Sequence, residues 1–551
     1  MRIFCDTRGV TRMKNKGYFF TKYFLTVYLL ITVVLPIARL FGTIRGENVA
    51  AVFSSVQFLP MLKNSLITTV LATVISVVLS FALAYAINRS NIRFKSVFVV
   101  LFTIPMLIPS ISHGMGLVLL FGDNGLITNL LGINIELYGY RGIVMGSVLY
   151  SFPVSFLMFF DSFQYEDYMV YEAAGVLGLN KWRQFLVITL PGMQRTIVSA
   201  VLAVFTMVFT DYGVPLMTGG TEMTLPVYMY REVIGMMNFS GGAVVGVVLL
   251  MPAVVAFLMD LRKSNQVNSS STVTKSYVIE ENVLRDVLVY VLFAVVLFIL
   301  CLPIMAFICL SFVRQYPVDM SFSMDNLLKL MKNGIGMYFI NSMAIALLTA
   351  LVGTCLSYLS AYMTARSGKA VVEKVLHFCS MLSLAIPGVV LGLSFVLTFN
   401  RMPIYSTIFI LVLVNIVHFF SSPYLLAYNS LSKFNRNLED VADSLGISRM
   451  RMLRDVYIPC TMSTIVEMYS YYFVNSMITI SAVSFLMNFR TMPLALMIPQ
   501  LESQSFIEGT AMVSLLILVL NLAEKGIAFF IKRVLGKREN HTLAAEIISE
   551  S

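Results

Sequence analysis

The chain has 551 residues, of which 58% are hydrophobic and only 12% are charged, and its net charge is +10. Soluble domains are about 25% charged, and a single core stops growing near ~250–300 residues, so this composition excludes an ordinary soluble protein. The basic residues lie in short loops between apolar runs. This placement excludes a nucleic-acid partner and indicates a lipid bilayer as the solvent.

About twelve apolar runs are long enough to cross a bilayer, because a spanning helix needs about 20 residues. Runs of this length favour helices over barrel strands, since a backbone in lipid must satisfy its own hydrogen bonds. The predicted fold is therefore an all-α polytopic membrane protein. The runs cover residues 23–42, 65–87, 97–120, 142–160, 194–217 and 241–259, and then 287–312, 342–364, 376–399, 404–427, 464–488 and 507–531.

The distribution of Lys and Arg predicts the orientation of the chain. The N-terminal tail 1–20 and the loops 88–96 and 366–374 are rich in basic residues, whereas the loop 122–141 holds one base, Arg141. Since cytoplasmic loops carry the excess of Lys and Arg, we expect both termini to be cytoplasmic, which agrees with twelve crossings. The first apolar run is too long for the core of a signal peptide, so we expect a retained helix.

Cysteine and histidine give no sign of a metal or disulfide site. The six cysteines are scattered, mostly within the apolar runs, and the four histidines have no metal-ligand spacing. Neither a disulfide framework nor a zinc site is indicated, and we expect no cofactor.

A polar, Ser/Thr/Asn-rich stretch from residue 262 to 275 separates two similar halves and is typical of a flexible cytoplasmic linker. The predicted organisation is a first half with six transmembrane helices (1–261), a linker (262–285), a second half with six more (286–533) and a cytoplasmic tail (534–551).

Ordered matches between the halves support a duplication. The sequence NSLITTVLATV begins at Asn64, and the similar NSMAIALLTAL begins at Asn341. Arg89 and Arg366 have the same separation as these two asparagines, and IPSISHGMGL at 108 resembles IPGVVLGLSF at 386. Two copies in the same order, each with six crossings, predict parallel repeats related by an axis along the membrane normal.

A charged segment interrupts each half between its fourth and fifth spans, on the predicted cytoplasmic side. The first is EAAGVLGLNKWRQFLVITLP, from Glu172 to Pro191. We expect Glu172 near the start of a short helix, Gly178 in a left-handed turn that ends it, and Asn180 as N-cap of a second helix. Trp182 lies on the predicted apolar face of that second helix. Pro191 marks the entry to the fifth span.

The second copy, DVADSLGISRMRMLRDVYIP, runs from Asp440 to Pro459 and repeats this plan with glycine and proline at matching places. Its bend is predicted at Gly446, its N-cap at Ser448 and its end at Pro459. A helix–turn–helix with a small-residue bend, flanked by large apolar groups and positive charge, is suited to fill a groove on another protein. A loop that merely lies on the membrane would explain the amphipathic pattern but not a matched bend in both halves.

The first segment resembles the signature loop of ATP-binding-cassette importer permeases: Glu-Ala-Ala, three residues, Gly, and an Ile-x-Leu-Pro ending. In that family the loop is the coupling helix that docks on the cytoplasmic ATPase. The second copy departs from the pattern at Asp440, Val441 and Ile458. The resemblance implies docking roles for Glu172, Ala173, Ala174, Gly178, Trp182 and Pro191, and for Asp440, Ala442, Gly446, Met450 and Pro459.

Membership of that family implies a permease subunit of a bacterial nutrient importer in the cytoplasmic (inner) membrane, and not an enzyme. Its partners would be two copies of a separate ATPase and an extracytoplasmic solute-binding protein. Fused double permeases of this size resemble transporters for ferric iron, thiamine and 2-aminoethylphosphonate. Residues 209–220 and 238–260 look most like the 2-aminoethylphosphonate branch, so that solute is the first expectation and ferric iron or thiamine the alternative.

Asp211 is the one acid well within the fifth apolar run. A charge there is costly, so we expect it to face a cavity or a partner. Two interpretations are open: a pore or gate residue, or an interfacial anchor near the outer end of the helix. Its counterpart in the second half, at the spacing of the two charged segments, is Thr479.

A self-sufficient secondary transporter with two six-helix halves is the rival interpretation from another class. It would need several titratable groups at mid-membrane, where the spans offer few, and it leaves the paired loop unexplained. An intramembrane enzyme is disfavoured because no His, Asp or Ser/Lys set clusters at one depth. The chain also lacks a GxxxxGK[ST] phosphate-binding loop, so a partner must hydrolyse ATP.

Overall fold

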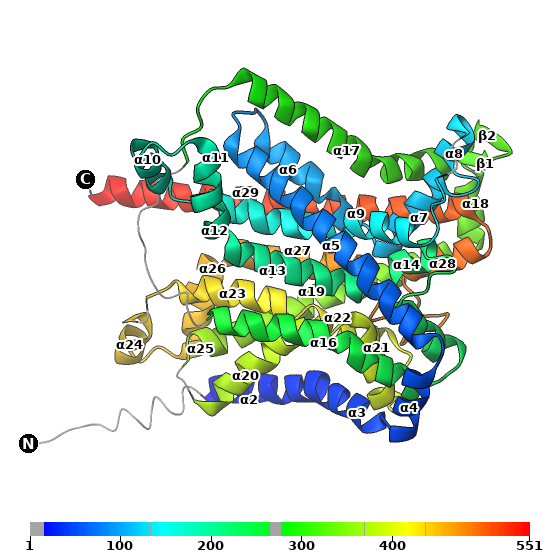
Figure 1. Ribbon diagram of the computed structural model, residues 1–551. Coiled ribbons are helices and arrows are strands. Elements are labelled where there is room, and N and C mark those ends of the chain that lie inside the picture. The colour runs from blue at the N-terminus through cyan, green and yellow to red at the C-terminus, as the bar shows by residue number, and fades with distance from the viewer. Residues whose placement is uncertain (1–15, 133–134, 265–276, 368–369, 436, 551) are drawn as a thin grey trace, which may run out of the picture. The chain divides into compact units, whose positions relative to one another are not determined.

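The computed structural model describes residues 16–132, 135–264, 277–367, 370–435 and 437–550 (Figure 1). In these residues the protein is almost entirely helical, as predicted. The described exception is a short antiparallel pair, β1 (Val313–Gln315) and β2 (Asp319–Phe322). The predicted linker segment 262–275 lies largely outside the described residues.

The helices group into two compact units. The larger unit comprises residues 44–335 and 495–517, and the smaller one residues 1–43, 336–494 and 518–551. We call them the large unit and the small unit, and describe each by itself.

The large unit holds most spans of the first half and the loops around them. Its elements are α4 (Gly46–Ser54), α5 (Phe58–Arg89), α6 (Lys95–Thr103), η2 (Ile104–Leu107), α7 (Ser110–Phe121), α8 (Leu126–Leu131), α9 (Tyr140–Gln164), α10 (Tyr168–Val176), α11 (Lys181–Gln184), η3 (Phe185–Thr189), α12 (Leu190–Gly192), α13 (Gln194–Phe209), α14 (Gly213–Thr218), α15 (Leu225–Tyr230), η4 (Arg231–Gly235), α16 (Phe239–Ser264), α17 (Val283–Ser311), β1, β2, α18 (Asp325–Lys332), nearly all of α28 (Leu494–Ser503) and the start of α29 (Ile507–Glu550).

The small unit holds most of the second half together with the first span of the chain. Its elements are α2 (Lys16–Leu29), η1 (Leu30–Val34), α3 (Leu35–Thr43), α19 (Ile335–Ala365), α20 (Val371–Leu382), η5 (Ser383–Ala385), α21 (Gly388–Phe399), α22 (Ile408–His418), α23 (Ser421–Ser432), α24 (Asn437–Ser444), α25 (Arg449–Met452), η6 (Leu453–Tyr457), α26 (Ile458–Cys460), α27 (Met462–Ile478) and the remainder of α29.

The two sequence halves exchange their first spans. Helix α17 opens the second half, yet it packs in the large unit, where Phe293 contacts Phe98 and Phe102 at ring-centroid distances of 5.0 and 5.2 Å. Helix α2 opens the first half, yet it packs on α20 in the small unit. The two units are defined by which helices pack together, not by sequence order. The boundaries 1–261 and 286–533 describe the repeat in the sequence, and they remain a prediction.

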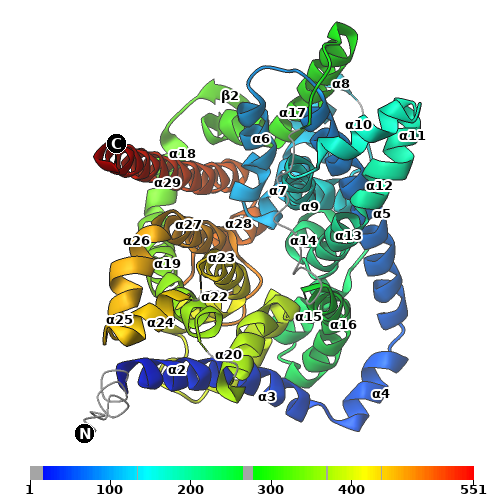
Figure 2. The ribbon, with the colours of Figure 1, turned by 90° about the vertical axis from the view of Figure 1, so that its left-hand side faces the viewer.

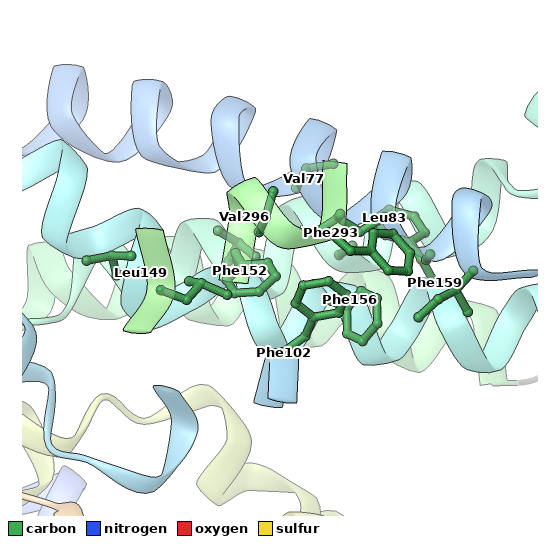
Figure 3. Close-up of a cluster of buried hydrophobic side chains, with 14 of the residues drawn as sticks. Val77, Leu83, Phe102, Leu149, Phe152, Phe156, Phe159, Phe293 and Val296 are labelled. Carbon is green, nitrogen blue, oxygen red and sulfur yellow. The ribbon is translucent and has the colours of Figure 1, made fainter. Parts of the chain in front are cut away.

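The core of the large unit is a cluster of aromatic side chains, drawn in Figure 3. Phe102, Phe152, Phe156, Phe159 and Phe293 are all fully buried. Rings of Phe102 and Phe156 meet edge to face at 5.3 Å, an arrangement that adds to the gain from burial. This cluster joins α6, α9 and α17, so it also holds the exchanged helix in place.

Small polar residues let the longest helices of the large unit approach closely. Helices α5 and α9 make the most extensive contact of the unit. Ser76 Oγ lies 2.9 Å from Ser151 Oγ, and Ser80 Oγ lies 2.5 Å from Ser155 Oγ. In lipid there is little hydrophobic drive between helices, so close packing and interhelical hydrogen bonds stabilise the pair.

Eight described helices are long and apolar enough to cross a membrane, or up to eleven if each bent pair counts as one span. Bends account for three of the twelve expected runs, and the run 464–488 is the one that remains, because its helix α27 has only 17 residues. The run 376–399 is broken by 115° before Gly388, and the run 404–427 by 52° after His418. The run 97–120 is similarly split at Pro109, between η2 and α7. Proline removes a backbone donor and disfavours a helical residue before it, so breaks form there.

The last helix includes most of the predicted cytoplasmic tail. Helix α29 runs from Ile507 to Glu550, so residues 534–550 of the predicted tail are helical, and their cytoplasmic location remains a prediction. Glu524 lies within it, and Ser470 Oγ donates to its carboxylate at 2.8 Å. This partner explains how the last apolar run tolerates a charge, since a buried carboxylate needs hydrogen bonds.

Candidate functional site

Two segments with matching backbone geometry form the candidate site. The first loop is residues 167–192, with α10, α11, η3 and α12, and the second loop is residues 437–460, with α24, α25, η6 and α26. Figure 2 shows α10, α11 and α12 following one another in the large unit, and α24, α25 and α26 doing so in the small unit.

The predicted bends are confirmed in both loops. Gly178 has φ +77° and Gly446 has φ +67°, the left-handed region that favours glycine. In the first loop, the amide of Leu179 donates to the carbonyl of Ala174 at 3.0 Å. In the second, the amide of Ile447 donates to the carbonyl of Ala442 at 2.8 Å. These bonds close each helix end by the same six-residue turn, which satisfies carbonyls that the helix leaves free.

The predicted N-caps of the second short helix are confirmed as well. The side chain of Asn180 accepts a hydrogen bond from the amide of Arg183 at 2.8 Å. Ser448 Oγ accepts from the amide of Arg451 at 3.3 Å, at the equivalent position of the second loop. These caps could be predicted from the sequence, because each capping hydrogen bond joins two residues only three positions apart.

A matching irregularity follows each second helix. The five-residue segments η3 and η6 are π-helical, and the amides of Leu190 and Ile458 donate to the carbonyls of Phe185 and Leu453. Each wide turn ends beside the proline of the motif, Pro191 or Pro459, which has no amide hydrogen to donate. In the first half the chain then bends by 61° into α13.

The expected position of Glu172 at a helix start is wrong. Helix α10 begins at Tyr168, and Asp167 caps it by accepting from the amide of Met169 at 3.0 Å. Glu172 therefore lies one turn inside the helix, because Asp167 provides an earlier cap of a better residue type. In the second loop, Asp440 does lie in the first turn of α24.

Each loop buries one alanine and exposes large apolar side chains. Ala174 and Ala442 are 7% and 6% exposed, whereas Ala173 is exposed. The exposed apolar side chains include Val176, Leu177 and Trp182 in the first loop, and Val441 and Leu445 in the second. Trp182 stacks on Phe185, with ring centroids 5.7 Å apart, so its ring is held in place although two thirds of it is exposed. Apolar groups held outward in this way are typical of a protein-interaction surface.

In both loops, charged side chains lie beside these exposed apolar ones. Lys181 and Arg183 are exposed beside Trp182 in the first loop. Met450 is partly buried, between Arg449 and the exposed Arg451 in the second. Lys181 pairs with Glu280, and in the second loop Arg449 and Arg451 pair with Asp443 and Asp455. Each loop thus offers exposed apolar side chains edged by ion-paired charges.

Arg366 clasps the second loop to the end of α19, a contact that the sequence analysis missed. Its Nε donates to Glu439 Oε1 at 2.7 Å, and its second terminal nitrogen donates to Glu439 Oε2 at 2.6 Å. Tyr457 Oη donates to the same carboxylate at 2.5 Å. Burial, the largest single effect, lowers the pKa of Arg366, but the hydrogen bonds and charges of Glu439 and Tyr457 together outweigh it and raise that pKa. The guanidinium therefore stays charged, and the paired fork geometry makes this a strong contact.

Arg89 makes the equivalent clasp on the first loop. It forms an ion pair with Glu166, next to the cap residue of α10, and its guanidinium lies over the rings of Tyr171 and Tyr277. Burial raises the pKa of Tyr171 to about 12, so the side chain stays a neutral phenol, and the electron-rich face of its ring attracts the guanidinium. The sequence indicated these two contacts only by placing Arg89 and Arg366 at equivalent positions of the repeat. Their acidic partners, Glu166 and Glu439, are not at equivalent positions.

Asp211 lies just after α13, which ends at Phe209. Its carboxylate accepts from Ser110 Oγ at 2.6 Å and from the amide of Val214 at 2.9 Å. The side chain therefore joins the start of α7 to the start of α14. In the small unit, Thr479 follows the end of α27 and is buried.

Gly388 stands in the second repeat where Ser110 stands in the first, two positions after the matched Ile386 and Ile108. A Cβ atom at Gly388 would collide with Ser481 Oγ and lie 3.0 Å from the ring of His418. The equivalent corner of the small unit is therefore closely packed, and only glycine fits there. Among the described residues, no group of three or more His, Cys, Asp or Glu side chains is placed to hold a metal ion.

Comparison with known proteins gives a family match for both halves. Residues 76–262 and 353–536 each match the family described as "Binding-protein-dependent transport system inner membrane component", and together they make up more than half of the chain.

Individual relatives carry the names of three solutes. The ferric transport system permease protein of Actinobacillus pleuropneumoniae is 24% identical over 76% of this chain, which spans 63% of that relative. The sulfate transport system permease protein of Synechococcus elongatus is 24% identical over 31% of this chain and 63% of its own. The thiamine transport system permease protein of Brucella suis is 24% identical over 25% of this chain and 27% of its own. These relatives give no support to the 2-aminoethylphosphonate assignment, while the alternatives of ferric iron and thiamine fit them.

Proposed function

Because this chain belongs to the family of inner membrane components of binding-protein-dependent transport systems, we propose that it supplies both transmembrane halves of one ATP-driven importer. It is a multi-pass membrane protein and a transport component. The proposal adds that two copies of an ATPase bind its two loops, and that an extracytoplasmic binding protein delivers the solute.

The observation that carries this proposal is the identical backbone plan of the two loops. Both have a left-handed glycine, a six-residue closing turn, a capped short helix, a π-helical segment and a proline, in the same order. A membrane-surface loop has no need of this repetition. Two copies of one partner need two copies of one surface. The exposed Trp182 provides an aromatic anchor of the kind that dominates binding energy, and Leu445 adds exposed apolar area in the second loop.

The orientation follows from the charge pattern and is part of the proposal. With both termini in the cytoplasm, the first and second loops lie on the cytoplasmic side, where ATP is available. The chain would then sit in the bacterial inner membrane.

Ferric iron is the solute we propose, because the ferric transport relatives cover the largest share of this chain. In such a system the binding protein would hold the metal outside, and the permease would pass it on as cargo. Thiamine is the second candidate, and it rests on shorter matches.

Co-purification tests the proposed function. The tagged chain is expressed with a candidate ATPase of the same organism, and the eluate is assayed for that ATPase and for ATP hydrolysis. We expect the ATPase to elute at two copies per chain. Uptake of ferric iron, thiamine and sulfate by cells that carry the complete system should then favour ferric iron. Elution of the chain alone, with solute uptake driven by an ion gradient, would support a secondary transporter instead.

A further inference from the structure

The second spanning helix of the first half is tied at the end opposite Arg89 to a segment after the fifth span. Asn64 Nδ2 donates to Glu222 Oε2 at 2.8 Å and to the carbonyl of Met223 at 3.2 Å. Ser65 Oγ accepts from the amide of Leu225 at 2.8 Å. Leu225 is the first residue of α15, so Ser65 acts as a cap supplied by another helix.

The second half repeats this tie. Asn341 Nδ2 donates to the carbonyls of Arg490 and Met492 at 2.8 and 3.3 Å. Ser342 Oγ accepts from the amide of Leu494, the first residue of α28, at 2.7 Å. In both repeats the asparagine bonds to the carbonyl two residues before the short helix, and the serine bonds to the first amide of that helix. The remaining bond differs, since Asn64 reaches the side chain of Glu222 and Asn341 the carbonyl of Arg490. We call residues 220–225 and 489–494 the outer segments.

The same two helices carry the arginine clasps at their other ends. Arg89 is the last residue of α5, and Arg366 directly follows α19. Arg366 and Glu439 are 2% and 9% exposed, so the clasp is a buried contact whose loss would leave an unpaired charge. Each helix is therefore held at one end to an outer segment and at the other end to a loop of the candidate site.

Helices α5 and α19 are also unbroken between these ties. They have 32 and 31 residues, which corresponds to about 45–50 Å at 1.5 Å per residue. The runs that form the third and fourth spans of the second half are bent by 115° and 52°. An unbroken helix tied firmly at both ends can carry displacement along its axis, whereas a helix broken by a sharp bend absorbs it.

We propose that α5 and α19 act as struts, each of which moves an outer segment together with the loop of the same half. Asn64, Ser65 and Arg89 are the positioning residues of one strut, and Asn341, Ser342 and Arg366 those of the other. This inference rests on the proposed function, because it makes the loops the place where ATPase closure enters. Coupling through a rigid element with fixed contacts at both ends is a physical route between distant sites.

The test follows an outer segment while nucleotide is bound to the ATPase that docks on the loops. A cysteine is placed at the exposed position Phe489, in a chain whose native cysteines are replaced by serine, and the complex with its ATPase is reconstituted in nanodiscs. The rate of maleimide labelling is measured without nucleotide and with ATP plus vanadate. We expect the parental complex to change its labelling rate when nucleotide is trapped. Thr221 provides the equivalent exposed position in the first half.

Breaking either end of the strut should abolish this response. In Asn341→Ala with Ser342→Ala, the nucleotide-dependent change at position 489 should fall about tenfold, as expected for losing two or three hydrogen bonds. Arg366→Gln should do the same from the other end. The ATPase should still co-elute with the Asn341/Ser342 variant, and its basal ATP hydrolysis should be unchanged.

Matched variants separate a strut from general damage. Ser360→Ala lies on α19, but its hydroxyl bonds only to its own helix, at Leu356, so the response should be retained. Ser342→Thr keeps the hydroxyl and should also retain it. Asn341→Asp keeps the size but loses the donor, and it replaces the alanine variant if that protein does not accumulate.

The outcomes are distinguishable from a failure of the proposed function. A full response at position 489 in both the Asn341/Ser342 variant and Arg366→Gln, with the ATPase bound, would overturn the strut and leave docking intact. A parental chain that binds no ATPase would contradict the proposed function and the strut with it. Loss of the response with the ATPase still bound supports the strut.

Discussion

Lys22 and Glu373 are far apart in the chain, and they form a buried ion pair with 2.7 Å between Nζ and Oε1. Their side chains are 7% and 6% exposed. Ser367 Oγ donates to the same carboxylate oxygen at 2.9 Å. Lys22 lies on α2 and Glu373 on α20, so the pair links the first span of the chain to a helix of the second half.

Removal of either partner should destabilise the small unit strongly. Lys22→Met or Glu373→Gln leaves a buried group without its partner, which costs about 3–5 kcal/mol. The double variant Lys22→Met, Glu373→Leu should recover most of that loss, because an apolar pair can replace a buried ion pair. Thermal unfolding in detergent measures both effects.

The matched control is the exposed pair Lys532 and Glu467 in the same unit, 38% and 51% exposed. Breaking it should change the free energy of unfolding by less than about 1 kcal/mol. Equal losses from the buried and the exposed pair would show that Lys22 and Glu373 do not hold the first span.

Cutting the linker should leave two halves that need each other. The first half lacks α17, whose Phe293 completes the core of the large unit, and the second half lacks α2. We expect neither half to accumulate when expressed alone, and both to co-purify when expressed together after cleavage between residues 265 and 276. A second half that is as stable alone as with its partner would contradict the exchange of first spans.

Gly178→Val and Gly446→Val should each disable one loop. The left-handed backbone conformation is less stable by roughly 1–2 kcal/mol for a residue with a Cβ atom, and the difference is larger for a β-branched residue. Each variant should therefore still insert, but solute-stimulated ATP hydrolysis and transport should fall sharply because both loops must engage the ATPase.

Gly175→Ala is the control for this pair. Gly175 lies within α10, and a Cβ there meets only Gln184 Nε2, at 3.9 Å. Alanine should stabilise the helix by up to about 1 kcal/mol and leave hydrolysis unchanged. Parental hydrolysis and transport in both valine variants would refute the docking role of the loops.

Asp211→Asn should impair transport without loss of the ATPase. The amide side chain can still accept one hydrogen bond, but the charge that Ser110 and the amide of Val214 stabilise is gone. Hydrogen bonds to a charged group contribute about 1.5–3 kcal/mol. If the transport path uses this charge, the rate of solute uptake should therefore fall about tenfold or more.

Ser110→Ala separates the two interpretations of Asp211. It removes one bond and keeps the charge, so uptake should be less affected than in Asp211→Asn. Unchanged uptake in Asp211→Asn would favour an interfacial anchor over a residue of the transport path.

A cysteine at Ser270 tests the orientation. The linker follows six predicted crossings from a cytoplasmic N-terminus, so this thiol should react with an impermeant maleimide only after the cells are opened. A cysteine at Thr221, in the outer segment 220–225, should react in intact cells. Reaction at Ser270 in intact cells would reverse the proposed orientation.

Features that depend on neighbouring residues could be predicted from the amino-acid order. The all-helical fold follows from apolar runs that must satisfy their own backbone in lipid. The left-handed Gly178 and Gly446 and the caps at Asn180 and Ser448 followed from bonds within a few residues, and the structure confirms them. Glu172 was misplaced because an earlier cap, Asp167, competes for the same helix start.

The sequence did not indicate which distant segments pack together, and only the structure showed this. The exchange of α2 and α17 depends on pairs such as Lys22 with Glu373 and Phe293 with Phe102, which no local pattern indicates. The arginine at the end of each second span was visible as a repeat, but its acid lies at different positions in the two halves, at Glu166 and Glu439. Local geometry is set by a few neighbouring dihedral angles, whereas these contacts form only after whole helices have packed, and that packing depends on all of their neighbours at once.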